Sequence, residues 1–509
     1  MSCRVVWFKR DLRLHDHTPL AEAAREGPVL CLYVVEPGLW AQPDASARQW
    51  GFVRESLRDL DRALKALGAR LHVRVGDAVD VLARLHAQQP FSALHAHEET
   101  GNTWTFDRDR AVARWCRAQG VRYREWPQAG VVRGLRERDG WQGRRDAFMA
   151  LPQVVCPPGL VDAGAGDQPL VLPEASSLGL RDADAVRRQR GGRQEGVAVL
   201  RSFLDSRSQR YRGGISSPLS ATTACSRLSP YLAYGCLSVR EVEQATGDRL
   251  ARLPADAYPQ RLGLQGFGSR LAWHDHFIQK LESEPELEWR NLHRAYDGLR
   301  EHEWSDERFA ALEQGRTGWP LVDACVAMLR ETGWLNFRMR AMLVSVAAYP
   351  LWLHWREVGL WLARQFVDYE PGIHWSQLQM QSGTTGINTT RVYNPIKQAR
   401  DQDLQGLFVR RWLPALRKVP DAWLFEPWRM PADTQARCGV RVGVDIPVPV
   451  VDLDAALRAA KARVHALRAR PDVQAGEADI VRRHGSRAGR REQPSRRRSA
   501  AEMAQQELF

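Results

Sequence analysis

Short apolar runs alternate with amphipathic stretches over the first 130 residues. The pattern predicts buried strands at 4–8, 29–35, 71–75, 93–96 and 121–126, with helices at 46–67 and 107–118 between them. Strands that alternate with helices pair in parallel, so this region predicts an α/β domain with a doubly wound parallel sheet. Ligands of such sheets bind beyond the carboxyl ends of the strands, and the loop from Trp7 to His17 is a candidate site or a plain connection.

Helical periodicity replaces the strand pattern after a connector rich in Pro, Gly, Asp and Ala. The connector is expected at 131–195 and an all-α domain at 196–430. Helices are predicted at 197–206, 230–232, 239–246, 269–281, 321–331, 339–348 and 358–367. A C-terminal extension is expected at 431–470, extended over 446–453 and helical over 454–467, before a basic, disordered tail at 471–509.

Composition narrows the class of protein. A chain of 509 residues is too long for one core, and no run of eighteen apolar residues predicts a membrane helix. The eight cysteines are scattered without a CxxC pair, which favours reduced thiols in a cytoplasmic protein and no metal site. The net charge of +13 favours a polyanionic partner such as nucleic acid, although solubility or a genomic preference for Arg would also explain it.

One non-periodic segment is too polar for a core and too specific for a linker. Residues 383–397 read GTTGINTTRVYNPIK, and residues 409–414 add VRRWLP. Gly, Thr, Asn and basic side chains in one ordered loop suit an anionic ligand. An ordinary surface loop is the equal alternative.

Seven motifs in one order resemble the photolyase/cryptochrome family over about residues 1–430. They are VVWFKRDLRLHDHTPL at the N-terminus, CSRLSPYLAYGCLS at 225–238, TGWPLVDACVAML at 317–329, TGWLNFRMRAM at 332–342, DYEPG at 368–372, RVYNP at 391–395 and RRWLPAL at 410–416. The resemblance implies that the helical domain binds FAD and that damaged DNA is the partner of a monomeric protein.

The resemblance also implies the residues that hold FAD. They are Tyr211, Cys225 (where the family usually has Thr), Ser226, Arg227, Leu228, Ser229, Arg340, Asp368, Tyr369, Glu370 and His374. Hydroxyls, backbone N–H groups and a guanidinium suit a pyrophosphate, and an Arg–Asp pair suits a negative flavin. His374 could bond the flavin and titrate near neutral pH. Helix capping, a structural salt bridge and a core histidine are the alternatives for these groups.

Photoreduction of flavin in this family uses a chain of three Trp residues. Trp355 matches the middle member and Trp304 the outer one, whereas the inner position falls on Leu378, which cannot give an electron. Either Trp375 or another nearby indole, Trp352 or Trp361, substitutes for it, or photoreduction in this protein takes another route. Plain packing is the alternative for every one of these indoles.

The lesion pocket departs from the pattern of cyclobutane-dimer photolyases. Trp273 matches the stacking Trp, but Arg270 replaces a Glu, His274 an Arg, and Phe337 an Asn. Arg cannot accept a hydrogen bond from a base, so a different lesion, a single-stranded substrate or a non-repair role is expected. The residues expected to contact DNA phosphates match the family motifs more closely than the lesion pocket does. They are Arg338, Arg391, Lys397, Gln398, Arg410 and Arg411. A solvated basic face is the alternative.

The N-terminal domain of the family often carries a light-harvesting chromophore. Glu98, Glu99 and Arg108 could hold one of the folate or deazaflavin type, and an empty domain is equally expected.

Three functions follow from the sequence. The first is a light-driven DNA repair enzyme of the deoxyribodipyrimidine photolyase type. The alternatives are a cryptochrome-like blue-light photoreceptor with a signalling partner, and a DNA-binding protein without flavin.

Overall fold

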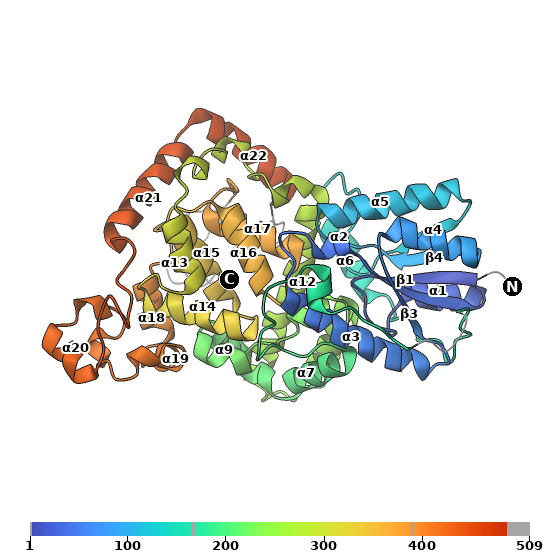
Figure 1. The fold of residues 1–509 in the computed structure, drawn as a ribbon, viewed down its shortest axis with the longest axis horizontal. Coiled ribbons are helices and arrows are strands. Elements are labelled where there is room, and N and C mark those ends of the chain that lie inside the picture. The colour runs from blue at the N-terminus through green and yellow to red at the C-terminus, as the bar shows by residue number, and fades with distance from the viewer. Residues whose placement is uncertain (1–2, 165–168, 388–390, 486–509) are drawn as a thin grey trace.

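A five-stranded parallel sheet forms the N-terminal domain (Figure 1). The computed structural model describes residues 3–164, 169–387 and 391–485. The sheet order is β3-β2-β1-β4-β5, from β1 (Cys3–Phe8), β2 (Val29–Val35), β3 (Leu71–Val75), β4 (Phe91–His97) and β5 (Arg122–Trp126). The five predicted strands are therefore confirmed, with small changes at their ends.

Helices cover both faces of this sheet. Val6 and Phe8 of β1 pack in one core with α1 (Thr18–Glu26) and α3 (Ala47–Lys65), and Val5 and Trp7 pack in a second core with α4 (Ala78–Gln88) and α5 (Thr103–Ala118). Successive residues of a strand point to opposite faces, which explains the division. The doubly wound prediction is confirmed. The strand order reverses between β1 and β4, so the loops after these two strands meet at the edge where ligands of such sheets bind.

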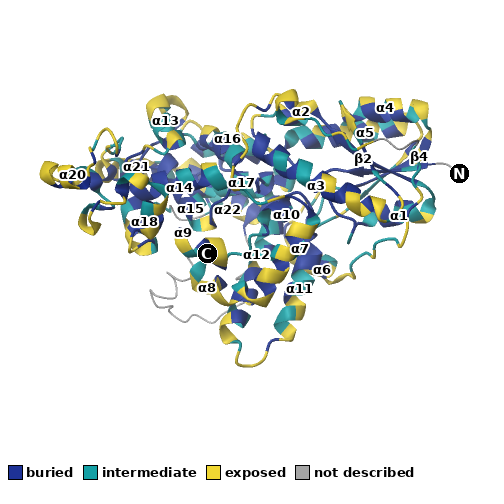
Figure 2. Cartoon of the chain, turned by 60° about the horizontal axis from the view of Figure 1, so that its bottom comes forward, coloured by how far each residue is buried: buried dark blue, intermediate teal, exposed yellow. Residues whose placement is uncertain are grey.

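The rest of the chain is largely helical, as predicted. Its helices are α6 (Trp141–Ala150), α7 (Arg193–Asp205), α8 (Tyr211–Gly214), α9 (Pro218–Ala224), α10 (Ser229–Ala233), α11 (Val239–Ala251), α12 (Tyr258–Ser283), α13 (Asp306–Gln314), α14 (Pro320–Thr332), α15 (Phe337–Ala348), α16 (Trp355–Gln365), α17 (Pro371–Ser382), α18 (Pro395–Gln402), α19 (Leu407–Trp412), α20 (Ala432–Cys438), α21 (Leu453–Arg468) and α22 (Pro471–His484). Figure 2 shows buried residues continuing from the sheet through these helices, with α20 largely exposed. Within the described residues, no helix is long and apolar enough to cross a membrane.

The C-terminal extension corrects one prediction. Its predicted helix is confirmed as α21, but the predicted disorder is wrong for 471–484, which form α22; residues 486–509 lie outside the described part of the chain. Figure 1 shows α21 and α22 arching over the outer edge of the helical domain. Ile480 packs with Leu281, Leu287 and Leu292, and the Arg483 guanidinium lies 2.6 Å from the Glu284 carboxylate.

Hydrogen bonds from the backbone and a side chain of the loop after β1 join the two domains. The Leu12 N–H donates to the Tyr234 carbonyl over 3.1 Å, and the Arg13 guanidinium donates to the Gly235 carbonyl over 3.0 Å. Gly235 has φ of +60°, and a Cβ there would lie 2.3 Å from the carbonyl oxygen of Arg10. Only glycine satisfies both conditions. This contact brings the switch point of the sheet against the helical domain.

Candidate functional site

Two adjacent cavities lie among α12, α15, α17 and the turn before α10. Their volumes are about 250 and about 300 Å³. Eight residues line both: Cys225, Ser229, Trp334, Phe337, Asp368, Glu370, Ile373 and Gln377. Together they are large enough for an extended organic cofactor, because single ligand pockets span roughly 300–1,000 Å³.

The turn at 225–229 gives the cavities a cationic wall. Arg227 has φ of +62°, and its guanidinium stacks 3.7 Å from the ring centre of Trp334. Burial lowers the pKa of Arg227 to about 10, so the group is still a cation at neutral pH. Burial raises the pKa of the Cys225 thiol to about 12, which keeps it neutral. A strained backbone that holds a cation over an aromatic ring suits an anionic ligand group.

Most of the other residues that are predicted to hold FAD in or near this turn also line the cavities. Tyr211 and Ser226 line the larger cavity, while Leu228 is buried in the hydrophobic core and lines neither. Leu228 is the N-cap of α10 and no side chain caps this helix, which argues against a capping role for Ser229. The helix has five residues, so its dipole adds little to anion binding.

The predicted pair of Arg340 and Asp368 is present. Their closest N–O distance is 2.7 Å, and both carboxylate oxygens of Asp368 accept from one guanidinium nitrogen. The Leu335 carbonyl accepts from Arg340 Nε over 2.8 Å, and the Phe366 ring lies 3.9 Å below the guanidinium. Three partners therefore fix this cation on the wall of the smaller cavity.

Several buried polar atoms around the smaller cavity have no hydrogen-bond partner among the described residues. They are Glu370 Oε1, Asn336 Oδ1, Gln377 Nε2 and Gln381 Oε1. An unpaired buried polar atom costs about 1–3 kcal/mol, so four of them around one cavity are the mark of a polar ligand. Acceptors and a donor in one place fit a planar ring that carries both N–H and carbonyl groups. The residues present therefore fit FAD.

His374 lies in the smaller cavity and is neutral. Its Nε2 donates to the Gly359 carbonyl over 2.9 Å, which leaves Nδ1 with a lone pair. Burial lowers the pKa of His374 to about 4, so the prediction that it titrates near neutral pH is wrong. The rings of Tyr369 and Trp375 lie 5.1 and 5.0 Å away and hold the imidazole in place.

A pair of fully buried indoles lies next to His374. Trp375 follows it directly, and the Trp355 ring lies 5.9 Å from the Trp375 ring. Leu378 lines the smaller cavity one helical turn beyond Trp375. The Trp355 N–H donates to Asn291 Oδ1 over 2.8 Å, whereas Trp375 Nε1 is buried without a partner in the described structure. Trp375 therefore supplies an indole next to His374 of the cavity, although the expected inner position of the chain is Leu378.

The other tryptophans differ in their surroundings. The Trp304 N–H donates to Asp306 Oδ1 over 2.8 Å near the surface, and its ring lies 5.0 Å from that of Phe309. Trp352 lies between two guanidiniums, 4.7 Å from Arg300 and 4.8 Å from Arg463. Two adjacent cations oppose the oxidation of this ring, so Trp352 is a poor substitute for the inner indole.

The predicted lesion residues surround the larger cavity. Arg270, Trp273, His274, Phe337 and Arg338 all line it. The Arg270 guanidinium lies 5.2 Å from the Trp273 ring centre, and the Phe337 side chain is 48% exposed although it lines both cavities. An exposed aromatic ring at the mouth of a cavity is a ready stacking surface for a base.

The predicted phosphate contacts are more dispersed. Arg338 donates weakly to Gln398 across 3.5 Å, which places these two side chains together near the mouth. Lys397 instead pairs with Asp401 at 3.2 Å and lines a separate groove of about 830 Å³. Arg410 pairs with Asp421, and the Arg411 guanidinium lies 5.9 Å from the Trp412 ring. Arg391 is half-buried, and residues 388–390 of the same loop lie outside the described residues.

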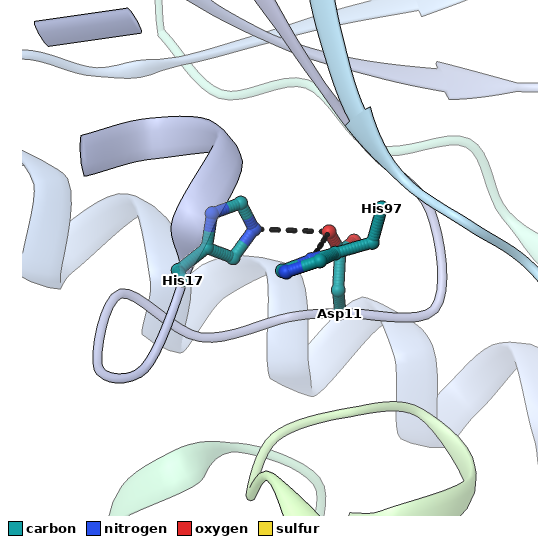
Figure 3. A group of neighbouring side chains, drawn as sticks. All are labelled: Asp11, His17 and His97. Atoms are coloured by element: carbon teal, nitrogen blue, oxygen red, sulfur yellow. Dashed lines mark hydrogen bonds and ion pairs between the residues drawn. The ribbon is translucent and has the colours of Figure 1, made fainter. Parts of the chain in front are cut away.

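Sequence reasoning missed a buried polar cluster at the switch point of the sheet. Asp11 Oδ2 lies 2.9 Å from His17 Nε2 and 2.8 Å from His97 Nδ1 (Figure 3). The three side chains could form a metal site by proximity. However, His17 Nδ1 accepts from the Leu20 N–H, so the proton of the neutral ring is on Nε2, where a metal would need a lone pair. The cluster is better explained as a hydrogen-bonded carboxylate.

The predicted antenna residues are held by one another. Arg108 is buried and pairs with Glu36 at 2.8 Å, Glu99 at 2.6 Å and Asp109 at 2.8 Å. Glu99 lines a cavity of about 80 Å³ between the domains, but Glu98 does not. That volume is too small for a folate or a deazaflavin unless side chains move.

Comparisons with known proteins agree with this geometry. Residues 4–133 match the family model for DNA photolyase, and residues 267–466 match that for the FAD-binding domain of DNA photolyase. The chain is 31% identical to a cryptochrome DASH of Gloeobacter violaceus, over 88% of this chain and 93% of that protein. It is 26% identical to a deoxyribodipyrimidine photo-lyase of Alkalihalophilus pseudofirmus, over 89% and 95%.

A solved structure gives the same result for the whole architecture. The crystal structure of a bacterial class III photolyase from Agrobacterium tumefaciens superposes with a TM-score of 0.80 at 26% identity, covering 92% of this chain and 98% of that one. The same family is therefore indicated by the order of the sequence motifs, by the two-domain architecture and by the cavity beside the Arg340–Asp368 pair. The chain belongs to the photolyase/cryptochrome family.

Proposed function

We propose that this protein is a light-driven DNA repair flavoprotein of the deoxyribodipyrimidine photolyase type. The observation that carries the proposal is the shared wall of the two cavities. Phe337, exposed at the mouth, lines the same space as the half-buried Arg340 and its buried partner Asp368, so a base that stacks on Phe337 would lie next to a ligand held by that pair. The names of relatives in both comparisons support a repair activity.

The chemistry that reduced FAD would supply there is light-driven transfer of one electron to a pyrimidine dimer, with return of the electron after both bonds that join the bases in a cyclobutane dimer have broken. The residues of this chain would do the rest. Trp273 and Phe337 would stack on a flipped dimer, at about 1–3 kcal/mol for each base. Arg270 would donate to carbonyl oxygens of the bases, and Arg338 would contact phosphate. Arg340 would keep a fixed positive charge beside the cofactor.

A repair assay on defined lesions tests the proposal. The protein, with bound FAD reduced, is illuminated with oligonucleotides that carry one cyclobutane dimer or one (6-4) photoproduct, as single and double strands. Light-dependent repair of one of these lesions is expected. Phe337→Ala should weaken the binding of damaged DNA, by roughly 1–3 kcal/mol, and leave the flavin content unchanged. Absence of repair for all four substrates, in protein that holds reduced FAD, would reject the enzyme.

A photoreceptor of the cryptochrome type is the second candidate, favoured by the buried indole pair behind the cavity. In that case light would reduce the flavin through Trp375 and Trp355 without repair. Trp375→Phe should then abolish rapid photoreduction, and Trp352→Phe, between its two guanidiniums, should leave it nearly unchanged. Rapid photoreduction combined with a negative repair assay would favour this candidate.

A further inference from the structure

One side chain of the N-terminal domain reaches the wall of the cofactor cavities. Arg10, in the loop after β1, donates from Nη2 to the Tyr369 carbonyl over 2.9 Å and pairs with Glu370 Oε2 at 3.0 Å. Its Nε donates to the Ala233 carbonyl over 2.8 Å, and its guanidinium lies 5.3 Å from the Tyr234 ring centre. These four contacts fix the orientation of the guanidinium.

The loop that carries Arg10 is itself anchored. The next residue, Asp11, accepts from the Lys9 backbone N–H over 2.7 Å and from the two imidazoles described above. On the other side, Gly235 packs against the Arg10 carbonyl where no larger residue fits. Arg10 therefore has little freedom to turn away from Glu370.

Glu370 uses its two oxygens in different ways. Oε2 accepts from Arg10, whereas Oε1 is buried, has no partner among the described residues, and belongs to a side chain that lines both cavities. Burial raises the pKa of Glu370, and Arg10 is the main charge that opposes this rise. The charged and titratable groups around Glu370 are Arg10 from the loop after β1, Glu99 from the loop after β4, Tyr234 after α10, His274 from α12, and Asp368 and Tyr369 before α17.

We propose that Arg10 is a positioning residue of the cofactor site, which holds Glu370 ionised and with Oε1 turned into the cavity. The cavity ligand is then offered an acceptor rather than a hydroxyl group. This proposal rests on the proposed binding of FAD, but not on DNA repair. A purely structural clamp between the domains would make the same contacts, so the test must measure the charge of Glu370 and not stability alone.

The decisive measurement is the affinity of the full-length protein for FAD across the neutral pH range. Wild-type affinity should not change with pH, because the carboxylate stays ionised. In Arg10→Met the affinity should rise with pH, by up to about tenfold per pH unit, as Glu370 loses its proton. Arg10→Lys keeps the cation beside Glu370, so its FAD affinity should stay independent of pH even where the lost Nε contact to the Ala233 carbonyl lowers that affinity. The double variant Arg10→Met/Glu370→Gln should again be independent of pH.

Infrared spectra of the apoprotein provide a readout without flavin. The protonated carboxyl band at neutral pH should be larger in Arg10→Met than in wild type and in the double variant, because burial raises the pKa of Glu36 and of Glu282 to about 7 and these two groups add the same band to all three proteins. If Arg10→Met fails to fold, Arg10→Gln replaces it. A pH-independent affinity in the charge-removing variant, or a pH dependence that survives Glu370→Gln, would overturn the proposal. A negative repair assay would leave it standing, since it concerns FAD affinity only.

Discussion

The polar cluster at the sheet and the cavities of the helical domain use buried polar groups in opposite ways. Around Asp11, the carboxylate takes hydrogen bonds from two imidazoles and one backbone N–H. Around the cavities, Glu370, Gln377 and Gln381 each keep a buried atom without a partner among the described residues. Both regions were chemically attractive candidates for a site. A ligand site is therefore better marked by unpaired polar atoms gathered around a cavity than by a gathering of titratable groups that satisfy one another.

Removing the carboxylate of the closed cluster should have the largest effect. Asp11→Ala leaves three buried N–H groups without an acceptor and should lower the free energy of unfolding by about 3 kcal/mol. Urea unfolding measures this change. Asp77→Ala is the matched control, because exposed Asp77 only caps α4 and should cost about 1 kcal/mol. Equal losses in the two variants would contradict the closed-network description.

Acid should test the imidazole of the open region. His374 has a pKa of about 4 in the folded protein against 6.5 for the free side chain, so the unfolded chain binds more protons between these values. Stability should therefore fall as the pH drops from 6.5 to about 4. His374→Asn should flatten this dependence by up to about 1.4 kcal/mol per pH unit. Unfolding free energies measured across this pH window check the prediction. An equal pH dependence in wild type and in the variant would show that protons reach His374 in the folded protein.

Replacing an unpaired polar side chain of the cavities with an apolar one should have the smallest effect on folding. Gln377→Leu removes an amide whose Nε2 has no partner in the described structure and whose Oε1 accepts one long hydrogen bond, 3.4 Å from Gln381 Nε2, so the free energy of unfolding should change by less than about 1 kcal/mol. FAD affinity should fall by about 1–2 kcal/mol, because the ligand loses a hydrogen bond. Calorimetric titration with FAD compared with urea unfolding separates the two. A large loss of stability without loss of affinity would remove Gln377 from the site.

Local patterns predicted the scaffold better than the site. Alternating strands and helices located every strand of the sheet, since each side chain's face follows from its position in the strand. Helix α17 was missed because it is buried on most sides and shows no polar face. Its indole was identified from the sequence only as a substitute, because Leu378 lies one turn from Trp375 and either position can face the same neighbour.

Contacts between distant segments left no local signal. Arg10 and Glu370 are 360 residues apart, and nothing in either motif indicates that they pair. The helix α22 was mistaken for a disordered tail because its charges dominate the composition. In the structure, Asp479 pairs with Arg482 and Arg483, while Val473 and Ile480 are buried. Short-range ion pairs and two apolar residues are enough to order a segment that already has a surface to pack on.

The glycine contact between the domains has a mechanical consequence. With the Gly235 backbone pressed against the Arg10 carbonyl and hydrogen bonds on both sides of it, this junction leaves no room for a hinge. The small cavity beside Glu99 and the two larger cavities therefore keep a constant separation and mutual angle. Because the domains cannot separate at this junction, a ligand larger than about 80 Å³ could enter the first cavity only by displacing side chains that line it, such as Trp40 and Tyr33.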